Sequence, residues 1–268
     1  MTRTVSATET PSYSSDEMMT VTAGRQLRDG AVCFVGIGLP SEAANLARLT
    51  HAPNLVLIYE SGTIGTTPRV LPLSIGDGEL AETAVSVVGV PEVFSYWLQG
   101  GRIDVGFLSA AQIDKYANLN STVIGPYGRP RVRLPGAGGA PEIASAAGEV
   151  LVMLRHQRRT FVERVDFLTS VGFGRNGGSW SRSASAGPAA VITNLGVLRP
   201  DPDTNELMLS SIHPGVEVSK VLEETGWTLK VADELAVTEP PTDLELWTLR
   251  DLQRRTREAH QSWKPASV

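Results

Sequence analysis

The sequence predicts a single α/β domain with an open, mainly parallel β-sheet flanked by helices. Short apolar runs rich in β-branched residues alternate along the chain with segments of helical periodicity. Several of these runs end at a polar residue or a glycine, where open α/β sheets place their ligands. We therefore expect a disordered tail over residues 1–15, one α/β domain over 16–240, and a C-terminal helix and tail over 241–268.

The first half of the domain begins with a helix and then alternates strands and helices. The expected elements are a helix over 16–28, a strand over 31–35, a helix over 42–49, a strand over 55–59, a helix over 93–99, a strand over 103–108 and a short helix over 110–116. Ser15 or Asp16 is the expected cap of the first helix and Ser41 that of the second. Their side chains accept hydrogen bonds from the free amides at a helix start.

The second half continues the alternation and ends in an amphipathic helix. The expected elements are a helix over 142–147, a strand over 149–154, a half-buried segment over 161–168, strands over 189–193 and 206–212, and helices over 218–225 and 244–259. Residues 172–187 are rich in Gly and Ser, which predicts a mobile surface insertion or lid. In the last helix, Leu244, Trp247, Leu252 and the pair Arg254–Arg255 suit docking on another subunit or on the domain core.

The composition excludes several functional classes. Of the residues, 41% are hydrophobic and 20% are charged, a balance typical of soluble globular proteins. A formal net charge of -5 without a long Lys or Arg cluster argues against nucleic-acid binding. No apolar stretch is long enough to span a membrane. Cys33 is the only cysteine, which excludes an intrachain disulfide and favours a cytoplasmic location. It is expected to be a core residue.

Few residues of the sequence are candidates for binding a metal or a nucleotide. The four histidines are separated by whole elements, so no metal site is expected. The short basic segment Arg155–Arg159 is either a solvated turn or a contact for a nucleotide phosphate. Arg102, Arg129 and Arg131 are candidate contacts for a substrate carboxylate or a phosphate.

Glu60 is the candidate catalytic residue. It directly follows the apolar run Leu55–Tyr59, so it lies at the carboxyl end of a predicted buried strand. Gly62 and Gly65 allow backbone and substrate to approach closely. A partly desolvated carboxylate at this position can act as a nucleophile or a general base. The alternative is that Glu60 is a helix cap or a solvated turn residue.

Gly136, Gly138 and Gly139 form the densest glycine loop of the chain, just before the helix expected over 142–147. Successive backbone amides in such a loop can bind an anion. The alternative is a flexible surface loop. Opposite a carboxylate, an anion-binding loop suits acyl chemistry on a thioester, because it can stabilise the charge that develops on the thioester oxygen.

Six sequence blocks occur in an order that resembles the β subunit of the class I coenzyme A transferase family. The blocks are Gly36–Pro40, Tyr59–Gly62, Gln99–Asp104 with Gln112–Asp114 and Asn118–Asn120, Gly136–Gly139, Val191–Val197, and Ile212–Val216 with Thr225–Gly226. The resemblance covers roughly residues 17–240. It is strongest to the glutaconate-type branch and, within that branch, to the actinobacterial β subunits of cholesterol ring-cleaving hydrolases.

The resemblance implies a set of site residues and a partner. Glu60 matches the glutamate that forms a covalent thioester with coenzyme A (CoA), and Gly136, Gly138 and Gly139 match the oxyanion and CoA-binding loop. Further substrate-binding candidates are Ser61, Gly62, Arg102 and Asn194. No permanently bound cofactor is implied, because CoA arrives as part of the substrate. An α subunit is the implied partner, in an α2β2 heterotetramer with the active site between the subunits.

Three functions follow from this reading. The main expectation is the β subunit of a hydrolase that opens the last steroid ring, carried as a cyclic β-oxo acyl-CoA, by water addition and retro-Claisen cleavage in steroid catabolism. The first alternative is a CoA transferase subunit that moves CoA between (di)carboxylic acids through a glutamyl-CoA thioester. The second alternative is a non-catalytic subunit that shapes the CoA cleft. The sequence departs from most transferases in having Pro141 and Glu142 after the glycine loop.

Overall fold

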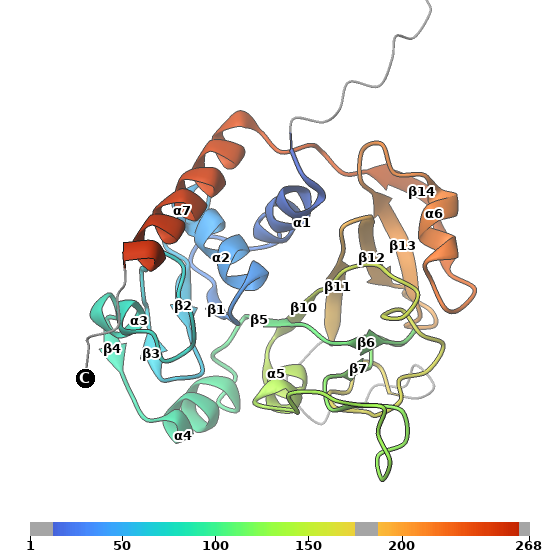
Figure 1. Ribbon diagram of the computed structural model, residues 1–268, viewed down its shortest axis with the longest axis horizontal. Coiled ribbons are helices and arrows are strands. Elements are labelled where there is room, and N and C mark those ends of the chain that lie inside the picture. Colours follow the sequence, from blue (N-terminus) through green and yellow to red (C-terminus); the bar gives the residue numbers. More distant parts are fainter. Residues whose placement is uncertain (1–12, 175–186, 263–268) are drawn as a thin grey trace, which may run out of the picture.

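The computed structural model describes residues 13–174 and 187–262. Most of the expected N-terminal tail and of the Gly/Ser-rich insertion therefore lies outside the described residues. The described chain forms a ten-stranded sheet with the order β14-β13-β12-β11-β10-β5-β1-β2-β3-β4 (Figure 1). Helices cover both of its faces.

The centre of the sheet is parallel, as the sequence predicts. It consists of β1 (Val32–Phe34), β2 (Val56–Ile58), β5 (Val105–Leu108), β10 (Glu149–Met153) and β11 (Pro188–Ile192), each parallel to its neighbours in this set. All five strands lie in or next to the expected apolar runs, and most of their side chains are buried. Burial on both faces explains why these strands read as continuous apolar runs.

Of the strands on the two flanks of the sheet, the sequence predicts only the one over 207–212. On one side, β12 (Gly196–Pro200) is antiparallel to β11 and to β13 (Leu207–Ile212), and β14 (Lys230–Val237) is parallel to β13. On the other, β3 (Thr63–Ile64) and β4 (Ser86–Val87) continue the sheet in antiparallel fashion. Two small hairpins stand apart from the sheet: β6 (Gln112–Ile113) with β7 (Leu119–Asn120), and β8 (Val123–Ile124) with β9 (Val132–Arg133).

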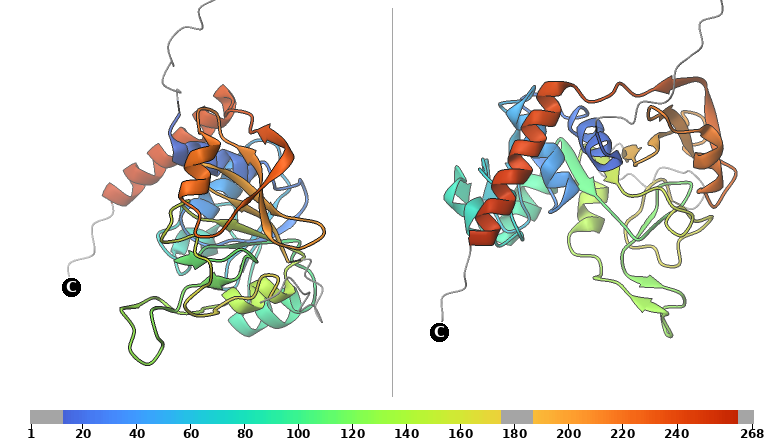
Figure 2. Two further views of the ribbon diagram at one scale, coloured as in Figure 1. Left: turned by 90° about the vertical axis from the view of Figure 1, so that its right-hand side faces the viewer. Right: turned by 45° about the horizontal axis from the view of Figure 1, so that its top comes forward.

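One face of the sheet packs against α1 (Ser15–Gly24) and α2 (Leu39–Leu49), and α7 (Asp243–Ser262) lies across these two helices (Figure 2). The opposite face packs against η1 (Val93–Leu98), α5 (Ala140–Ala146) and α6 (Val218–Glu223). Two short helices, α3 (Gly78–Glu82) and α4 (Val90–Glu92), lie on the path between β3 and η1.

The last helix joins the domain core through part of its predicted apolar face. Leu246, Leu249 and Leu252 are buried, whereas Leu244 and Trp247 are exposed. An ion pair joins α7 to the end of α1, because Arg25 Nη2 lies 2.7 Å from Glu245 Oε2.

Several local predictions are wrong. The first helix ends at Gly24 rather than at residue 28, and its cap is Ser14, which forms a capping box with Glu17. The second helix begins at Leu39, so Ser41 lies inside it and its hydroxyl contacts Tyr59 instead of a free amide. The helix expected over 110–116 is absent, because Gln112 and Ile113 form strand β6.

The sequence predicts that no apolar stretch is long enough to span a membrane. Within the part of the chain that the structure describes, no helix combines the length and the apolar character needed to cross a bilayer.

Candidate functional site

Glu60 projects into the layer that contains η1 and α5. Side chains alternate between the two faces of a strand. Leu57 and Tyr59 belong to the core beneath α1 and α2, and Ile58 belongs to the core beneath η1 and α5. Glu60 continues on the side of Ile58 and is half-buried. None of the described helices begins at Glu60, so it is not a helix cap.

The glycine loop brings Gly139 against Glu60. A Cβ atom added to Gly139 would lie 2.5 Å from Phe94 Cζ and 3.3 Å from Glu60 Oε1. Only a residue without a side chain fits between these two groups. Phe94 is held in place by Phe34 of β1, with the two ring centroids 5.9 Å apart. The structure therefore places the carboxylate and the loop side by side, although they lie far apart in the sequence.

The glycine loop is hydrogen-bonded to Ser121 through Gly136, whereas the backbone amides of Gly138 and Gly139 are unpaired among the described residues. The Gly136 amide donates to the Ser121 carbonyl oxygen at 2.9 Å, and the Ser121 hydroxyl donates to the Gly136 carbonyl at 2.7 Å. Gly136 and Gly138 have φ angles of 109° and 51°, which favour glycine. Within residues 13–174 and 187–262, the Gly138 and Gly139 amides have no hydrogen-bond acceptor. The amides of exposed Gly138 and buried Gly139 are therefore unpaired in the described chain, whereas that of Gly136 is occupied.

Ser61 and Gly62 lie in the turn that follows Glu60. Gly62 has a φ of 106°, and a Cβ atom there would lie 2.0 Å from the Val88 carbonyl oxygen. Glycine is thus required for β3 to approach the segment that contains β4. The Ser61 hydroxyl oxygen is buried and has no hydrogen-bond partner among the described residues.

A buried polar network holds the end of β2 from the opposite face. The Tyr59 hydroxyl lies 2.8 Å from Ser41 Oγ, and Asn45 Nδ2 donates to the Ser41 carbonyl at 2.9 Å. Arg48 donates from Nη2 to Asn45 Oδ1 at 3.2 Å. Burial raises the pKa of Tyr59 to about 12, so its hydroxyl keeps its proton at neutral pH. Sequence reasoning missed this network, because nothing in the local pattern pairs Tyr59 with a helix.

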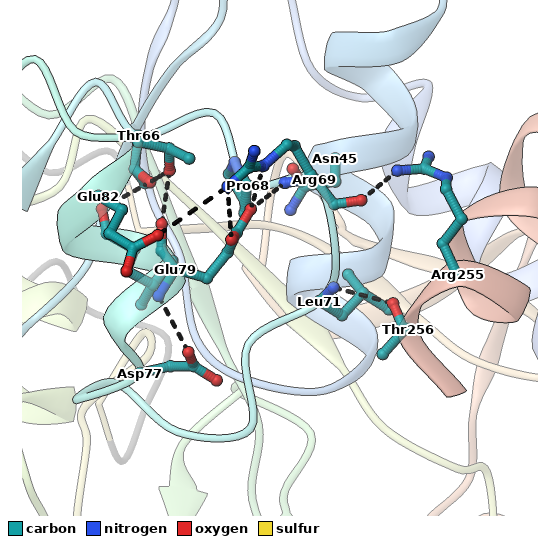
Figure 3. A network of polar contacts seen from close by, with 12 residues as sticks. Asn45, Thr66, Pro68, Arg69, Leu71, Asp77, Glu79, Glu82, Arg255 and Thr256 are labelled. Carbon is teal, nitrogen blue, oxygen red and sulfur yellow. Dashed lines mark hydrogen bonds and ion pairs between the residues drawn. The ribbon is translucent and has the colours of Figure 1, made fainter. Parts of the chain in front are cut away.

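The loop after β3 is fixed by α3 and α7 (Figure 3). The Leu71 amide donates to Thr256 Oγ1 at 2.9 Å, and Arg255 donates to the Arg69 carbonyl. The Arg69 amide donates to Glu79 Oε1 at 2.6 Å. The C-terminal helix therefore ties down the chain that continues from the Glu60 turn.

Two of the predicted substrate contacts are not brought to Glu60. Arg102 precedes β5 and donates to the Tyr96 carbonyl at the end of η1, so it lies at the amino edge of the parallel strands, opposite to Glu60. Asn194 follows β11 at the carboxyl edge, but β1, β5 and β10 separate β11 from β2. Its Oδ1 accepts the His156 amide at 2.8 Å.

The described residues contain no cluster of three or more His, Cys, Asp or Glu side chains that could hold a metal ion. Cys33 is buried, and burial raises the pKa of its thiol, so it is a core residue and not a nucleophile. Glu60 is the carboxylate that lies against the glycine loop.

The family model and two similar proteins indicate the same protein family. The family model described as "Coenzyme A transferase" matches residues 16–224. The B subunit of the 3-oxoadipate CoA-transferase from Pseudomonas knackmussii is 58% identical over 250 residues, which cover 92% of this chain and 96% of that protein. The B subunit of the glutaconate CoA-transferase from Acidaminococcus fermentans is 34% identical, with 85% of this chain and 88% of the relative covered.

The fold agrees with that of a solved relative. The crystal structure of the Acidaminococcus fermentans glutaconate CoA-transferase superposes with a TM-score of 0.83 at 30% identity, covering 90% of this chain and 94% of the other. Both share a mostly parallel sheet with flanking helices.

The expectation of a steroid-ring hydrolase is contradicted. The IpdB subunit of the cholesterol ring-cleaving hydrolase from Mycobacterium tuberculosis is only 27% identical, over 87% of this chain and 92% of the relative. This identity is less than half of that to the 3-oxoadipate transferase relative.

Proposed function

Because this chain belongs to the coenzyme A transferase family, we propose that it is the β subunit of a two-subunit enzyme that transfers CoA between carboxylic acids. The observation that carries the proposal is the approach of Glu60 Oε1 to Gly139, within 3.3 Å of where a Cβ atom would lie, in a loop whose Gly138 and Gly139 amides are unpaired within the described part of the chain. The 58% relative supports a dicarboxylic 3-oxo acid such as 3-oxoadipate as one substrate. The relatives named as B subunits support an α subunit as partner, and we extend the proposal to an α2β2 assembly.

In the proposed mechanism, a Glu60 carboxylate oxygen attacks the thioester carbonyl of the donor acyl-CoA. The amides of Gly138 and Gly139 donate to the developing oxyanion. Collapse expels the CoA thiolate and leaves an anhydride between Glu60 and the donor acyl group. The thiolate then attacks the Glu60 carbonyl, which releases the donor as a free carboxylate and forms a glutamyl-CoA thioester.

The second half runs the same steps in reverse with the acceptor. The acceptor carboxylate attacks the glutamyl thioester and expels the thiolate, and the thiolate attacks the acceptor carbonyl of the new anhydride. The products are a new acyl-CoA and a free Glu60 carboxylate, so no water is consumed. A nucleophile is required at Glu60, and a carboxamide at that position cannot complete the cycle.

An exchange assay tests this function. The complex with its α subunit receives an acyl-CoA and isotopically labelled 3-oxoadipate, and the label in the CoA ester fraction is followed by mass spectrometry. We expect labelled acyl-CoA to form while total thioester stays constant, and Glu60→Gln to lower the rate by at least about a thousandfold. Loss of thioester with release of free CoA, and no label in the ester, would contradict a transferase.

A further inference from the structure

The aromatic ring of Phe94 lies beside the Glu60 carboxylate. A Cβ atom on Gly139 would lie 2.5 Å from Phe94 Cζ, 2.8 Å from Phe94 Cε1 and 3.3 Å from Glu60 Oε1. The edge of the ring and the carboxylate oxygen are therefore neighbours on the same side of Gly139. Phe94 and Glu60 are both half-buried, so part of each side chain can be reached from outside the described chain. An acyl group that becomes attached to Glu60 thus begins next to this ring.

A wide helical turn sets the position of Phe94 within η1. The Gln99 amide donates to the Phe94 carbonyl oxygen at 2.8 Å, which is the i→i+5 spacing of a π-helix. Val93 and Leu98 also lie five residues apart, and both are fully buried in the core. Turns of this kind are rare and occur frequently at functional sites. Here the wide turn buries both ends of η1 and leaves the Phe94 ring at the glycine loop.

Packing holds the Phe94 ring in this position. The ring contacts Phe34 of β1, with the two centroids 5.9 Å apart and the planes tilted by 58°. Phe34 is itself buried in the sheet. The ring edge lies against Gly139 of the glycine loop. Close packing against a strand and a loop leaves little room for the ring to swing aside, so it acts as a fixed wall.

We propose that Phe94 is a specificity-determining residue that restricts the acyl group to chains without a branch next to the reacting carbonyl. The inference rests on the proposed CoA transfer at Glu60 and adds the class of acid that the site rejects. In the anhydride, the acyl carbonyl carbon is bonded to a Glu60 oxygen, so the next carbon of the chain lies close to the Phe94 ring. A CH₂ group there places only hydrogen atoms beside the ring, whereas a methyl branch requires space that the ring occupies. A linear 3-oxo acid such as 3-oxoadipate has a CH₂ group at this carbon.

Competition between two acceptor acids tests the inference on the complex with its α subunit. Adipate and 2,5-dimethyladipate are the probes, because they differ only in a methyl branch beside each carboxyl group. We expect the unmodified complex to prefer adipate in kcat/KM by at least about tenfold. Phe94→Leu and Phe94→Ala are each expected to lower this preference about tenfold, through faster transfer to the branched acid. Both acids are measured on one preparation, so the ratio does not depend on the fraction of folded protein.

Tyr96→Leu is the matched control, because Tyr96 is an aromatic residue of the same helix and is 65% exposed. This variant should keep the preference of the unmodified complex. Three results would overturn the inference: equal transfer to both acids by the unmodified complex, an unchanged preference in both Phe94 variants, or an equal loss of preference in Tyr96→Leu. A complex that transfers CoA to neither acid nor to 3-oxoadipate would reject the proposed function, and this inference with it.

Discussion

Gly139 is the residue at which the geometry of the site is most sensitive. Its Cα faces both the Phe94 ring and Glu60 Oε1, so a methyl group there would lie 2.5 Å from the ring and 3.3 Å from the carboxylate. Contacts below 3.0 Å force the surrounding groups to move. The Phe94 ring would have to move, and the Glu60 carboxylate would have to shift slightly away from the glycine loop.

Gly139→Ala is therefore expected to lower the transfer rate by about a hundredfold or more and to cost about 1–3 kcal/mol of stability. Steady-state kinetics and urea unfolding measure the two effects. Gly128→Ala is the control, since a Cβ atom at Gly128 meets open space. Equal activity of the two variants would show that close packing at Gly139 is not needed.

The site residues could be predicted from sequence only in part. Glu60 follows an apolar run, and the glycines stand in a dense cluster, so each has a local signal. The proximity of Glu60 to the glycine loop has no local sequence signal, because it depends on the sheet order and on the position of Phe94 in a neighbouring helix. Sequence also could not distinguish the amide of Gly136, which is bound to Ser121, from those of Gly138 and Gly139.

At the scale of elements, β2 and α2 are joined by the hydroxyl pair of Tyr59 and Ser41, 2.8 Å apart and fully buried. Tyr59→Phe leaves the Ser41 hydroxyl without this partner. We expect a loss of about 1–2 kcal/mol in the free energy of unfolding, measured by urea denaturation. Because Tyr59 directly precedes Glu60, the rate should also fall, with KM little changed. Full stability in Tyr59→Phe would show that the pair does not hold the strand end.

A second link between elements depends on pH. His156 follows β10, stacks on Phe161 with ring centroids 3.7 Å apart, and pairs through Nε2 with Thr225 Oγ1 at 2.9 Å. Burial lowers the pKa of His156 from its ordinary 6.5 to about 4. The folded state thus keeps a neutral imidazole, whereas the unfolded state takes up a proton below pH 6.5.

Stability should consequently be complete above pH 6.5 and fall as the pH is lowered toward 4, by up to about 3 kcal/mol from this residue. His156→Phe should flatten the pH dependence of the unfolding free energy, although buried His213, whose pKa burial also lowers, keeps part of it. Chemical denaturation at pH 7 and pH 5 gives the comparison. An unchanged slope in the variant would assign the acid sensitivity elsewhere.

Elements with a buried face could be predicted, and elements fixed by distant partners could not. The five parallel strands are apolar runs because both of their faces are covered. Strand β14 carries Asp233 and Glu234 and lies at an exposed edge, so its sequence gives no strand signal. The helix expected over 110–116 is a strand instead, because Gln112 pairs with Asn120 and its side chain accepts the Asp166 amide at 3.0 Å.

At the scale of the whole molecule, the Glu60 site is open in the isolated chain. Glu60 is half-buried and Gly138 is exposed, whereas anion stabilisation by amides is strongest where water is excluded. A covering surface has to come from outside the described residues. This agrees with the proposed α subunit. The β8–β9 hairpin also projects from the body, as the yellow-green loop at the bottom of Figure 1.

The purified chain alone is therefore expected to have less than about one-hundredth of the activity of the complex. Titration with the α subunit should restore the rate and saturate at one α subunit per chain. The exchange assay, combined with measurement of the assembly mass, gives both numbers. Full activity of the isolated chain would contradict a site shared between subunits.

The most direct test of the account is to trap the covalent intermediate. The complex is incubated with acyl-CoA, treated with borohydride, and digested, and the mass of the peptide that contains Glu60 is measured. We predict reduction of the Glu60 carboxyl to an alcohol, because borohydride reduces a thioester and leaves a free carboxylate intact. An unmodified Glu60 in a complex that transfers CoA at its normal rate would contradict the glutamyl-CoA thioester.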